Sequence, residues 1–165
     1  MFDEFKSRAE AGRAEVYRFS SKEKALTFII DVLKEEGVSD SLWPCAVWAN
    51  CSFLKGIDQA SLVEKVPGLT FDVTRETVTE AKVGISQMEW ALAATGTLVQ
   101  KSASVEQRLV SSLSQIHIAL IATDRILSDR EALLMKMSPD EIRFEWLYDF
   151  DRLIIIFVDE LGSTS

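Results

Sequence analysis

The chain has few of the side chains that bind structural metals. Two cysteines, Cys45 and Cys51, and a single histidine fall short of the four ligands of a typical zinc or iron–sulfur site. Their C-x5-C spacing also differs from the C-x2-C pairs of such sites. We therefore expect no metal in this chain alone, and predict that both cysteines are free, buried thiols on or beside a strand.

Proline, glycine and long apolar runs are also scarce. Three prolines and seven glycines among 165 residues argue against an all-β fold with many tight turns. The N-terminal segment has neither the basic nor the apolar region of a signal peptide, and the apolar run at residues 153–158 is far shorter than the roughly 20 residues of a membrane span. We expect a cytoplasmic protein with no membrane span, folded as a single domain over residues 1–165.

Positive charge is in deficit, with 18 Lys and Arg against 26 Asp and Glu and a net charge of -8. Long-range repulsion of phosphate backbones disfavours nucleic-acid partners, although backbone amides can still bind a small anion. The sequence also contains no G-x-G-x-x-G, G-x4-G-K-[ST], G-x-S-x-G or H-E-x-x-H pattern. It therefore offers no positive sign of dinucleotide binding, NTP hydrolysis, serine hydrolysis or zinc proteolysis.

What is present is an alternation of apolar strands with amphipathic helices. Short apolar runs predict strands at residues 44–49, 69–73, 89–93, 96–100, 116–122 and 153–158. Periodicity and capping signals predict helices at residues 2–15, between Ser20 and Gly37, at 59–65, from Thr74 to about Lys82, from Ser104 through Leu113, and from Ser128 and Ser138 onward. This alternation predicts an α/β fold with a mostly parallel sheet flanked by helices.

The last predicted helix carries a cluster of acidic residues, Asp140, Glu141, Glu145, Asp149 and Asp151. Paired carboxylates at this spacing can perform acid–base chemistry or bind a hard cation. The plainer interpretation is that they form the solvated face of an amphipathic helix.

One central segment resembles a known protein family. Residues 84–99 read GISQMEWALAATGTLV, and RLVSSL at residues 108–113 and IHI at residues 116–118 follow. These motifs resemble the signature of the LUD-domain (lactate-utilisation) family, in its T-G-T-L-V segment and its later V-H-I segment. The resemblance extends over nearly the whole chain.

The resemblance implies a fold similar to the sugar-phosphate isomerase and CoA-transferase (NagB/RpiA/CoA-transferase-like) group. It also implies an accessory subunit in the oxidation of L-lactate to pyruvate, with iron–sulfur clusters on partner subunits and no cofactor bound by this chain alone. The lack of cysteine clusters agrees with the C-type members of the family. The chain then has an N-terminal helical extension at residues 1–18 and a C-terminus shorter than the family's usual G-P-S-x-T-x-D-I-E segment.

The resemblance also directs attention to the Thr95-Gly96-Thr97 turn as a binding site. Glycine allows close approach of a ligand, and hydroxyls and amides can donate to an anion. The alternative is a tight connection between two antiparallel strands. The family's glutamate next to this turn is Ala94 here, so its role is lost or has moved to Glu89.

Three further residues are candidates for ligand binding. His117 is tempting as a general base, but alternation places it on the strand face opposite Ile116 and Ile118, where a structural histidine is the plainer interpretation. Glu89 and Arg108 are expected to form an ion pair. Alternatively, Arg108 binds a carboxylate or phosphate of a ligand. No catalytic residue can be assigned.

Two alternatives to the accessory subunit stay open. One is a small-molecule binder or transferase that recognises a phosphate, nucleotide or acyl-CoA at the Thr95-Gly96-Thr97 turn. The other is an interaction module, in which exposed aromatic side chains form a homo-oligomeric interface.

Overall fold

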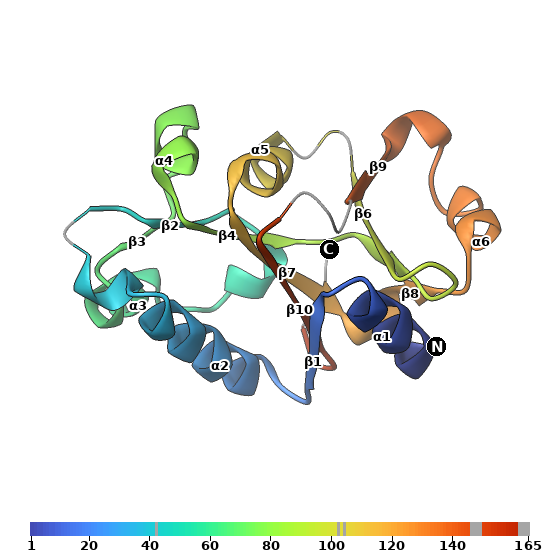
Figure 1. The fold of residues 1–165 in the computed structure, drawn as a ribbon, viewed down its shortest axis with the longest axis horizontal. Helices are drawn as coiled ribbons and strands as arrows, with labels where there is room; N and C mark the ends of the chain where they lie inside the picture. The colour runs from blue at the N-terminus through green and yellow to red at the C-terminus, as the bar shows by residue number, and fades with distance from the viewer. Residues whose placement is uncertain (42, 102, 104, 146–149, 162–165) are drawn as a thin grey trace.

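Six parallel strands form the central sheet of the protein, whose computed structural model describes residues 1–41, 43–101, 103, 105–145 and 150–161 (Figure 1). In spatial order the strands are β1 (Glu15–Phe19), β10 (Arg152–Val158), β7 (Ile116–Ala122), β4 (Val83–Gln87), β2 (Ala46–Trp48) and β3 (Leu69–Thr70). Every neighbouring pair in this sheet is parallel. The predicted α/β fold with a mostly parallel sheet is confirmed.

A smaller sheet, formed within residues 90–145, lies beside the central sheet (Figure 1). Its strands, in spatial order, are β8 (Ile126–Leu127), β5 (Trp90–Leu92), β6 (Thr97–Lys101) and β9 (Ile142–Glu145). β5 and β6 form the antiparallel hairpin predicted from the two short apolar runs. β9 pairs antiparallel with the other edge of β6, so the hairpin lies inside the small sheet.

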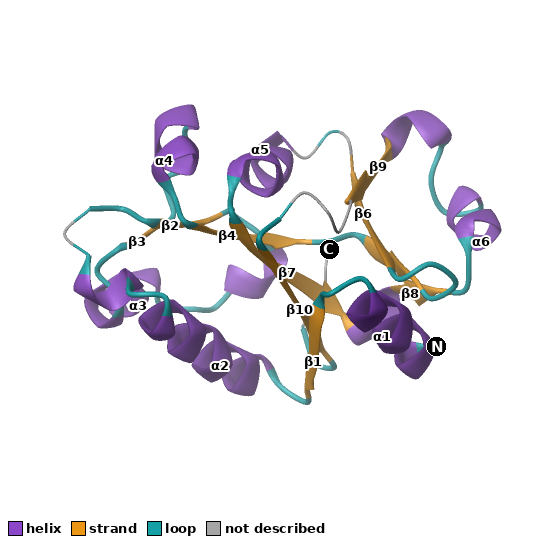
Figure 2. Ribbon diagram, in the orientation of Figure 1, coloured by secondary structure: helices purple, strands orange, loops and turns teal. Residues whose placement is uncertain are grey.

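Helices cover both faces of the central sheet (Figure 2). The α-helices are α1 (Phe2–Ala11), α2 (Lys22–Glu35), α3 (Gln59–Lys65), α4 (Arg75–Glu80), α5 (Val105–Leu113) and α6 (Arg130–Leu134). α2 and α3 bury apolar side chains against one face, and α1, α4 and α5 do so against the other. In the part of the chain that the structure describes, no helix has the length and apolar character needed to cross a membrane.

Strand β10 shows why the central strands are apolar at every position. Ile154 and Ile156 pack into the core on the α2 side, whereas Ile155 and Phe157 pack into the core on the α1 side. A parallel strand with helices on both faces has no solvent side, so the usual alternation of polar and apolar residues disappears. Phe157 also makes edge-to-face contacts with Phe2 and Phe5, which hold α1 on the sheet.

The N-terminal helix is shorter than predicted. It ends at Ala11, and the residues from Glu15 to Phe19 form the edge strand β1 of the central sheet. The segment 1–18 is therefore not helical throughout. The apolar positions Val16 and Tyr17 were too few to indicate a strand, because their partners in β10, Ile155 and Ile156, are 139 residues away in sequence.

Two predicted helix starts are each displaced by one residue. α2 is capped by Ser21 and not by Ser20. The hydroxyl of Ser21 accepts a hydrogen bond from the amide of Lys24. α6 is capped by Asp129 and not Ser128. Thr74 caps α4 as predicted. The predicted cap Ser104 lies outside the described residues.

The largest error lies in the segment after Ser138. One short 3-10 turn, Pro139–Glu141, is followed by β9 and not by a helix. Asp140 and Glu141 are therefore not part of a solvated helical face, and Asp149 lies outside the described residues. Strand β4 was also missed, because Gly84, Ser86 and Gln87 interrupt its apolar pattern.

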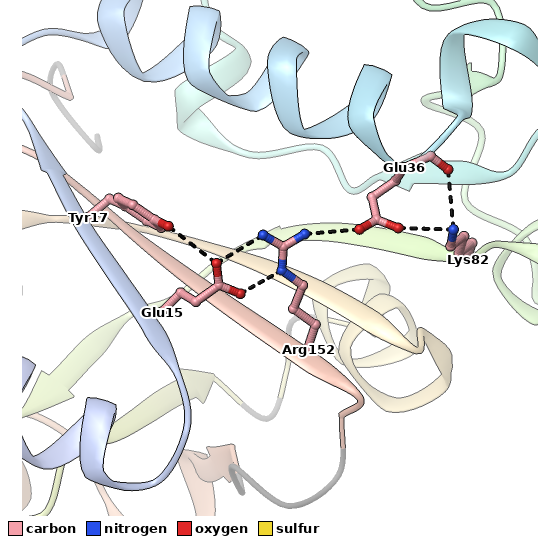
Figure 3. A network of polar contacts seen from close by, with 5 residues as sticks. All are labelled: Glu15, Tyr17, Glu36, Lys82 and Arg152. Atoms are coloured by element: carbon pink, nitrogen blue, oxygen red, sulfur yellow. Dashed lines mark hydrogen bonds and ion pairs between the residues drawn. The ribbon is translucent and has the colours of Figure 1, made fainter.

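An ion network joins the amino ends of three strands to the end of α2 (Figure 3). Arg152 binds both carboxylate oxygens of Glu15, at 2.5 and 2.9 Å, and one oxygen of Glu36 at 2.9 Å. Lys82 binds the other oxygen of Glu36 at 2.9 Å, and the Tyr17 hydroxyl donates to Glu15. Hydrogen bonds to these cations lower the pKa of both carboxyls, so Glu15 and Glu36 are ionised at neutral pH.

Candidate functional site

The order of connections places a crevice at the carboxyl ends of β2 and β4. From β2 the chain passes through α3, on one face of the sheet, to its neighbour β3. From β4 it passes through the small sheet and α5, on the other face, to β7. Adjacent parallel strands whose connections leave on opposite faces open a crevice between them, and ligands of open α/β sheets commonly bind there.

A cavity of about 250 Å³ occupies this position. Its described lining includes Cys51 and Ser52, which follow β2, and Ala122, which ends β7. Two cationic side chains, Lys101 and Arg125, also line it, together with one carboxylate and two glutamine side chains. The cavity is therefore polar and open to small molecules, and it lies on the edge of the sheet opposite the Arg152 network.

The charged side chains of the crevice share one carboxylate. Glu89 lies 3.5 Å from Lys101 and 3.4 Å from Arg125, and Arg125 also stacks over Trp90 with its guanidinium carbon 4.5 Å from the ring centre. Two cations and one anion leave the described lining with a net charge of +1, in a chain of net charge -8. This local excess of positive charge favours an anionic ligand.

Two glutamines hold the walls of the crevice together. The Gln87 side chain accepts from the amide of Phe53 at 3.0 Å and donates to the Ser52 hydroxyl at 2.7 Å. Gln107 accepts from the amide of Gln87 at 2.9 Å and donates to the carbonyl of Asn50 at 2.6 Å. Both side-chain amides thus bind the segment after β2, and Gln107 also binds the last residue of β4, so they fix the shape of the site before any ligand binds.

The cysteines are less buried than predicted. Both are free and half-buried, with Cys45 directly before β2 and Cys51 in the crevice. Burial raises the pKa of the Cys51 thiol, so it stays protonated at neutral pH. Cys51 therefore contributes a weakly polar surface to the crevice and not a thiolate nucleophile.

Comparison with protein-family models matches residues 2–143 to the LUD domain. The match covers more than half of the chain. The chain belongs to the LUD-domain family. This family is linked to lactate utilisation, and the resemblance seen in residues 84–118 is confirmed.

The LUD-domain fold is also present in a solved structure. The crystal structure of a DUF162 family protein from Deinococcus radiodurans aligns with a TM-score of 0.66 and 17% sequence identity, covering 95% of each chain. At this identity the likeness concerns the fold alone. A search of curated proteins returned no match.

Within this LUD domain the predicted pair of Glu89 and Arg108 does not form. Glu89 lies in the crevice and pairs with Lys101 and Arg125. Arg108 lies on α5 in a separate groove with Arg75 and Arg143. The prediction failed because Gln107 and Arg108, although adjacent in sequence, point about 100° apart on a helix.

The Thr95-Gly96-Thr97 turn of the LUD domain is covered by α1. Gly96 has φ +69°, and a Cβ atom there would lie 2.7 Å from the amide nitrogen of Ala9. Arg8 donates to the carbonyl of Ala93 at 3.0 Å, and Thr97 donates to Thr95 at 2.7 Å. Hairpin geometry and packing against α1 thus account for the glycine, and the ligand-binding role of this turn stays a prediction.

His117 lies in the core, on the strand face predicted for it. It is fully buried on β7, 2.5 Å from the Ser86 hydroxyl and beside the ring of Phe150. Burial lowers the pKa of His117 from 6.5 to about 3, so the imidazole is neutral at physiological pH. It lies outside the described lining of the crevice. The contact with Ser86 supports the structural interpretation.

This burial predicts a loss of stability in mild acid. The unfolded histidine takes up a proton as the pH falls through about 6.5, whereas the folded one does so only near pH 3. The free energy of unfolding is expected to fall by about 1.4 kcal/mol between about pH 7.5 and pH 5.5. Chemical denaturation at the two pH values measures it.

A variant isolates the contribution of this histidine. His117→Gln is expected to lose this pH dependence, since His117 is the only histidine in the chain. The lowered carboxyl pKa values of Glu15, Glu36 and Asp159 act below this window. An unchanged pH dependence in the variant would show that His117 is not responsible.

The sequence interpretation missed most of the crevice. Of its charged and amide side chains, only Glu89 was a candidate; Gln87, Lys101, Gln107 and Arg125 were not. A usable signal was the position of Gln87 at the end of a strand, but β4 itself had not been recognised. Lys101 ends β6 and Arg125 lies in the 3-10 turn Thr123–Arg125 between β7 and β8, and only the tertiary fold brings them together.

Proposed function

We propose that this LUD domain is an accessory subunit of an L-lactate-oxidising system and acts with iron–sulfur partner subunits. Family membership over residues 2–143 is the observation that carries the proposal. In this role the chain binds a small carboxylate, and the electron carriers belong to the partners. Its contribution is substrate positioning and not redox chemistry of its own.

The crevice supports this role through its charge. A monocarboxylate such as lactate neutralises the net +1 of the described lining. Arg125 can bind both oxygens of a carboxylate, and Lys101 adds a point charge. Glu89 holds these cations in place when no ligand is bound and opposes anions of higher charge.

A tagged pull-down from lactate-grown cells tests the partners. Co-purification of iron–sulfur proteins, with visible absorption that the isolated chain lacks, is the expected result. Deletion is expected to abolish growth on lactate. A partnerless, colourless eluate together with normal growth of the deletion strain would contradict the accessory role.

Substitutions in the crevice test the site separately from the assembly. Arg125→Gln with Lys101→Met is expected to lower lactate-dependent oxidation at least about tenfold, because charge-assisted hydrogen bonds are lost, while the partners still co-purify. Lys65→Met, at an exposed position at the end of α3, is the matched control and should keep wild-type activity. Wild-type activity in the crevice variant would remove the crevice from the proposal.

A further inference from the structure

A second cationic site lies on the opposite side of α5. Arg75 at the start of α4, Arg108 on α5 and Arg143 on β9 line a groove of about 300 Å³. Val105, Leu109 and Ser112, all on α5, also line it. Gln107, the neighbour of Arg108, faces the crevice, so α5 separates the two sites.

The fold makes little use of these guanidinium groups. Among the described residues, no acidic side chain forms an ion pair with Arg75, Arg108 or Arg143. Arg143 donates to the Ser112 hydroxyl at 3.1 Å. The Nε of Arg108 is buried and has no hydrogen-bond partner among the residues that the structure describes. Buried N–H donors normally have a hydrogen-bond acceptor. A ligand bound in the groove would provide one for Arg108.

The charge of the groove distinguishes its ligand from that of the crevice. None of its described lining residues is acidic, so the three arginines give a local charge of +3 on a chain of net charge -8. A monocarboxylate would leave two of these charges uncompensated, whereas a phosphate or diphosphate group matches them. Guanidinium groups bind phosphate oxygens in pairs, which suits a rim of arginines better than one of lysines.

We propose that this groove binds a small phosphate-bearing molecule. Arg75, Arg108 and Arg143 bind its phosphate oxygens from two helices and a strand. The apolar side chains of Val105 and Leu109 provide a surface for the uncharged part of the ligand. The proposal is independent of the crevice and of lactate.

Calorimetric titration of the full chain with inorganic pyrophosphate tests the proposal. We expect saturable binding that weakens at least about tenfold in Arg108→Gln and in Arg143→Gln, since each removes a charge-assisted contact. Lys65→Gln, which removes one exposed positive charge at the end of α3, away from both sites, is the matched control and should bind pyrophosphate like the wild type. Thermal unfolding curves establish that all variants are folded.

Three results would overturn the proposal. One is no measurable binding of pyrophosphate at millimolar concentration. Another is equal affinity in the wild type and both groove variants, since the anion then binds elsewhere. A third is binding of polyglutamate without binding of pyrophosphate, which would make the groove a contact surface for an acidic protein. The two proposals can fail separately: if the crevice variants do not affect lactate oxidation, pyrophosphate binding in the groove is still expected.

Discussion

Gly84→Ala is expected to lower the free energy of unfolding by about 2–3 kcal/mol, the upper part of the usual cost of overpacking a core. Gly84 lies in the central strand β4, directly beneath α5. A Cβ atom there would lie 2.7 Å from Cγ1 of Val110 and from Cβ of Ser114, and would also overlap the Ser114 hydroxyl. Neither a helix nor a strand held by neighbours on both edges can move aside freely. Denaturant unfolding of the variant measures the cost.

Two companion variants separate crowding from backbone conformation. Gly56→Ala is the matched control: Gly56 has φ +80° and no atom near the position of a Cβ, so only a backbone cost of about 1 kcal/mol is expected. Adding Ser114→Gly to Gly84→Ala should recover part of the loss, because it removes two of the overlapping atoms. Equal losses in Gly84→Ala and Gly56→Ala would show that α5 does not press on this strand.

Arg152→Met is expected to destabilise the protein by about 2–3 kcal/mol at neutral pH, below the cost of breaking a fully buried pair because the network is only partly buried. The substitution removes both hydrogen bonds to Glu15 and the one to Glu36, and leaves the two carboxylates without their shared cation. Arg152→Lys should recover only part of the loss, since lysine cannot bind a carboxylate in a fork. Denaturant unfolding at pH 7 measures both variants.

The pH dependence of this effect identifies its cause. In the wild type the pKa values of Glu15 and Glu36 lie below 4.5, so their stabilisation is present above that pH and is lost as the pH falls through the folded values. The difference between wild type and Arg152→Met should therefore shrink below about pH 4.5. Arg18→Met, which breaks one exposed pair with Asp159, is the control and should cost less than about 1 kcal/mol. A deficit for Arg152→Met that stays constant down to pH 3 would point to lost packing.

The strongest predictions from sequence concerned elements whose burial is uniform. Strand β7 was predicted with its observed bounds, as was α3, and the apolar run of β10 was found to within one residue. The hairpin β5–β6 was also recognised. A strand buried on both faces is continuously apolar, and a capped amphipathic helix has a period of its own, so both patterns are local and readable.

The errors occurred where distant partners determine the structure. β4 contains a glycine, a serine and a glutamine, and it is a strand because β2 and β7 pair with both of its edges. Residues 142–145 form a strand because β6 offers an unpaired edge. The local preference of a segment for helix or strand is too weak to outweigh such pairing. A single sequence does not show which strand has an unpaired edge.

The sequence by itself determined the alternation of helices and strands, the parallel α/β class, the acidic charge and membership of the LUD-domain family. Only the tertiary structure determined which charged side chains lie close together. Lys101 and Arg125 meet beside Glu89 because segments separated in sequence come together in the crevice at the carboxyl ends of β2 and β4. Arg108 lies on the other side of α5, in the groove with Arg75 and Arg143. Hydrophobic periodicity is a local property of the chain, whereas the field at a binding site sums over residues that only folding brings together.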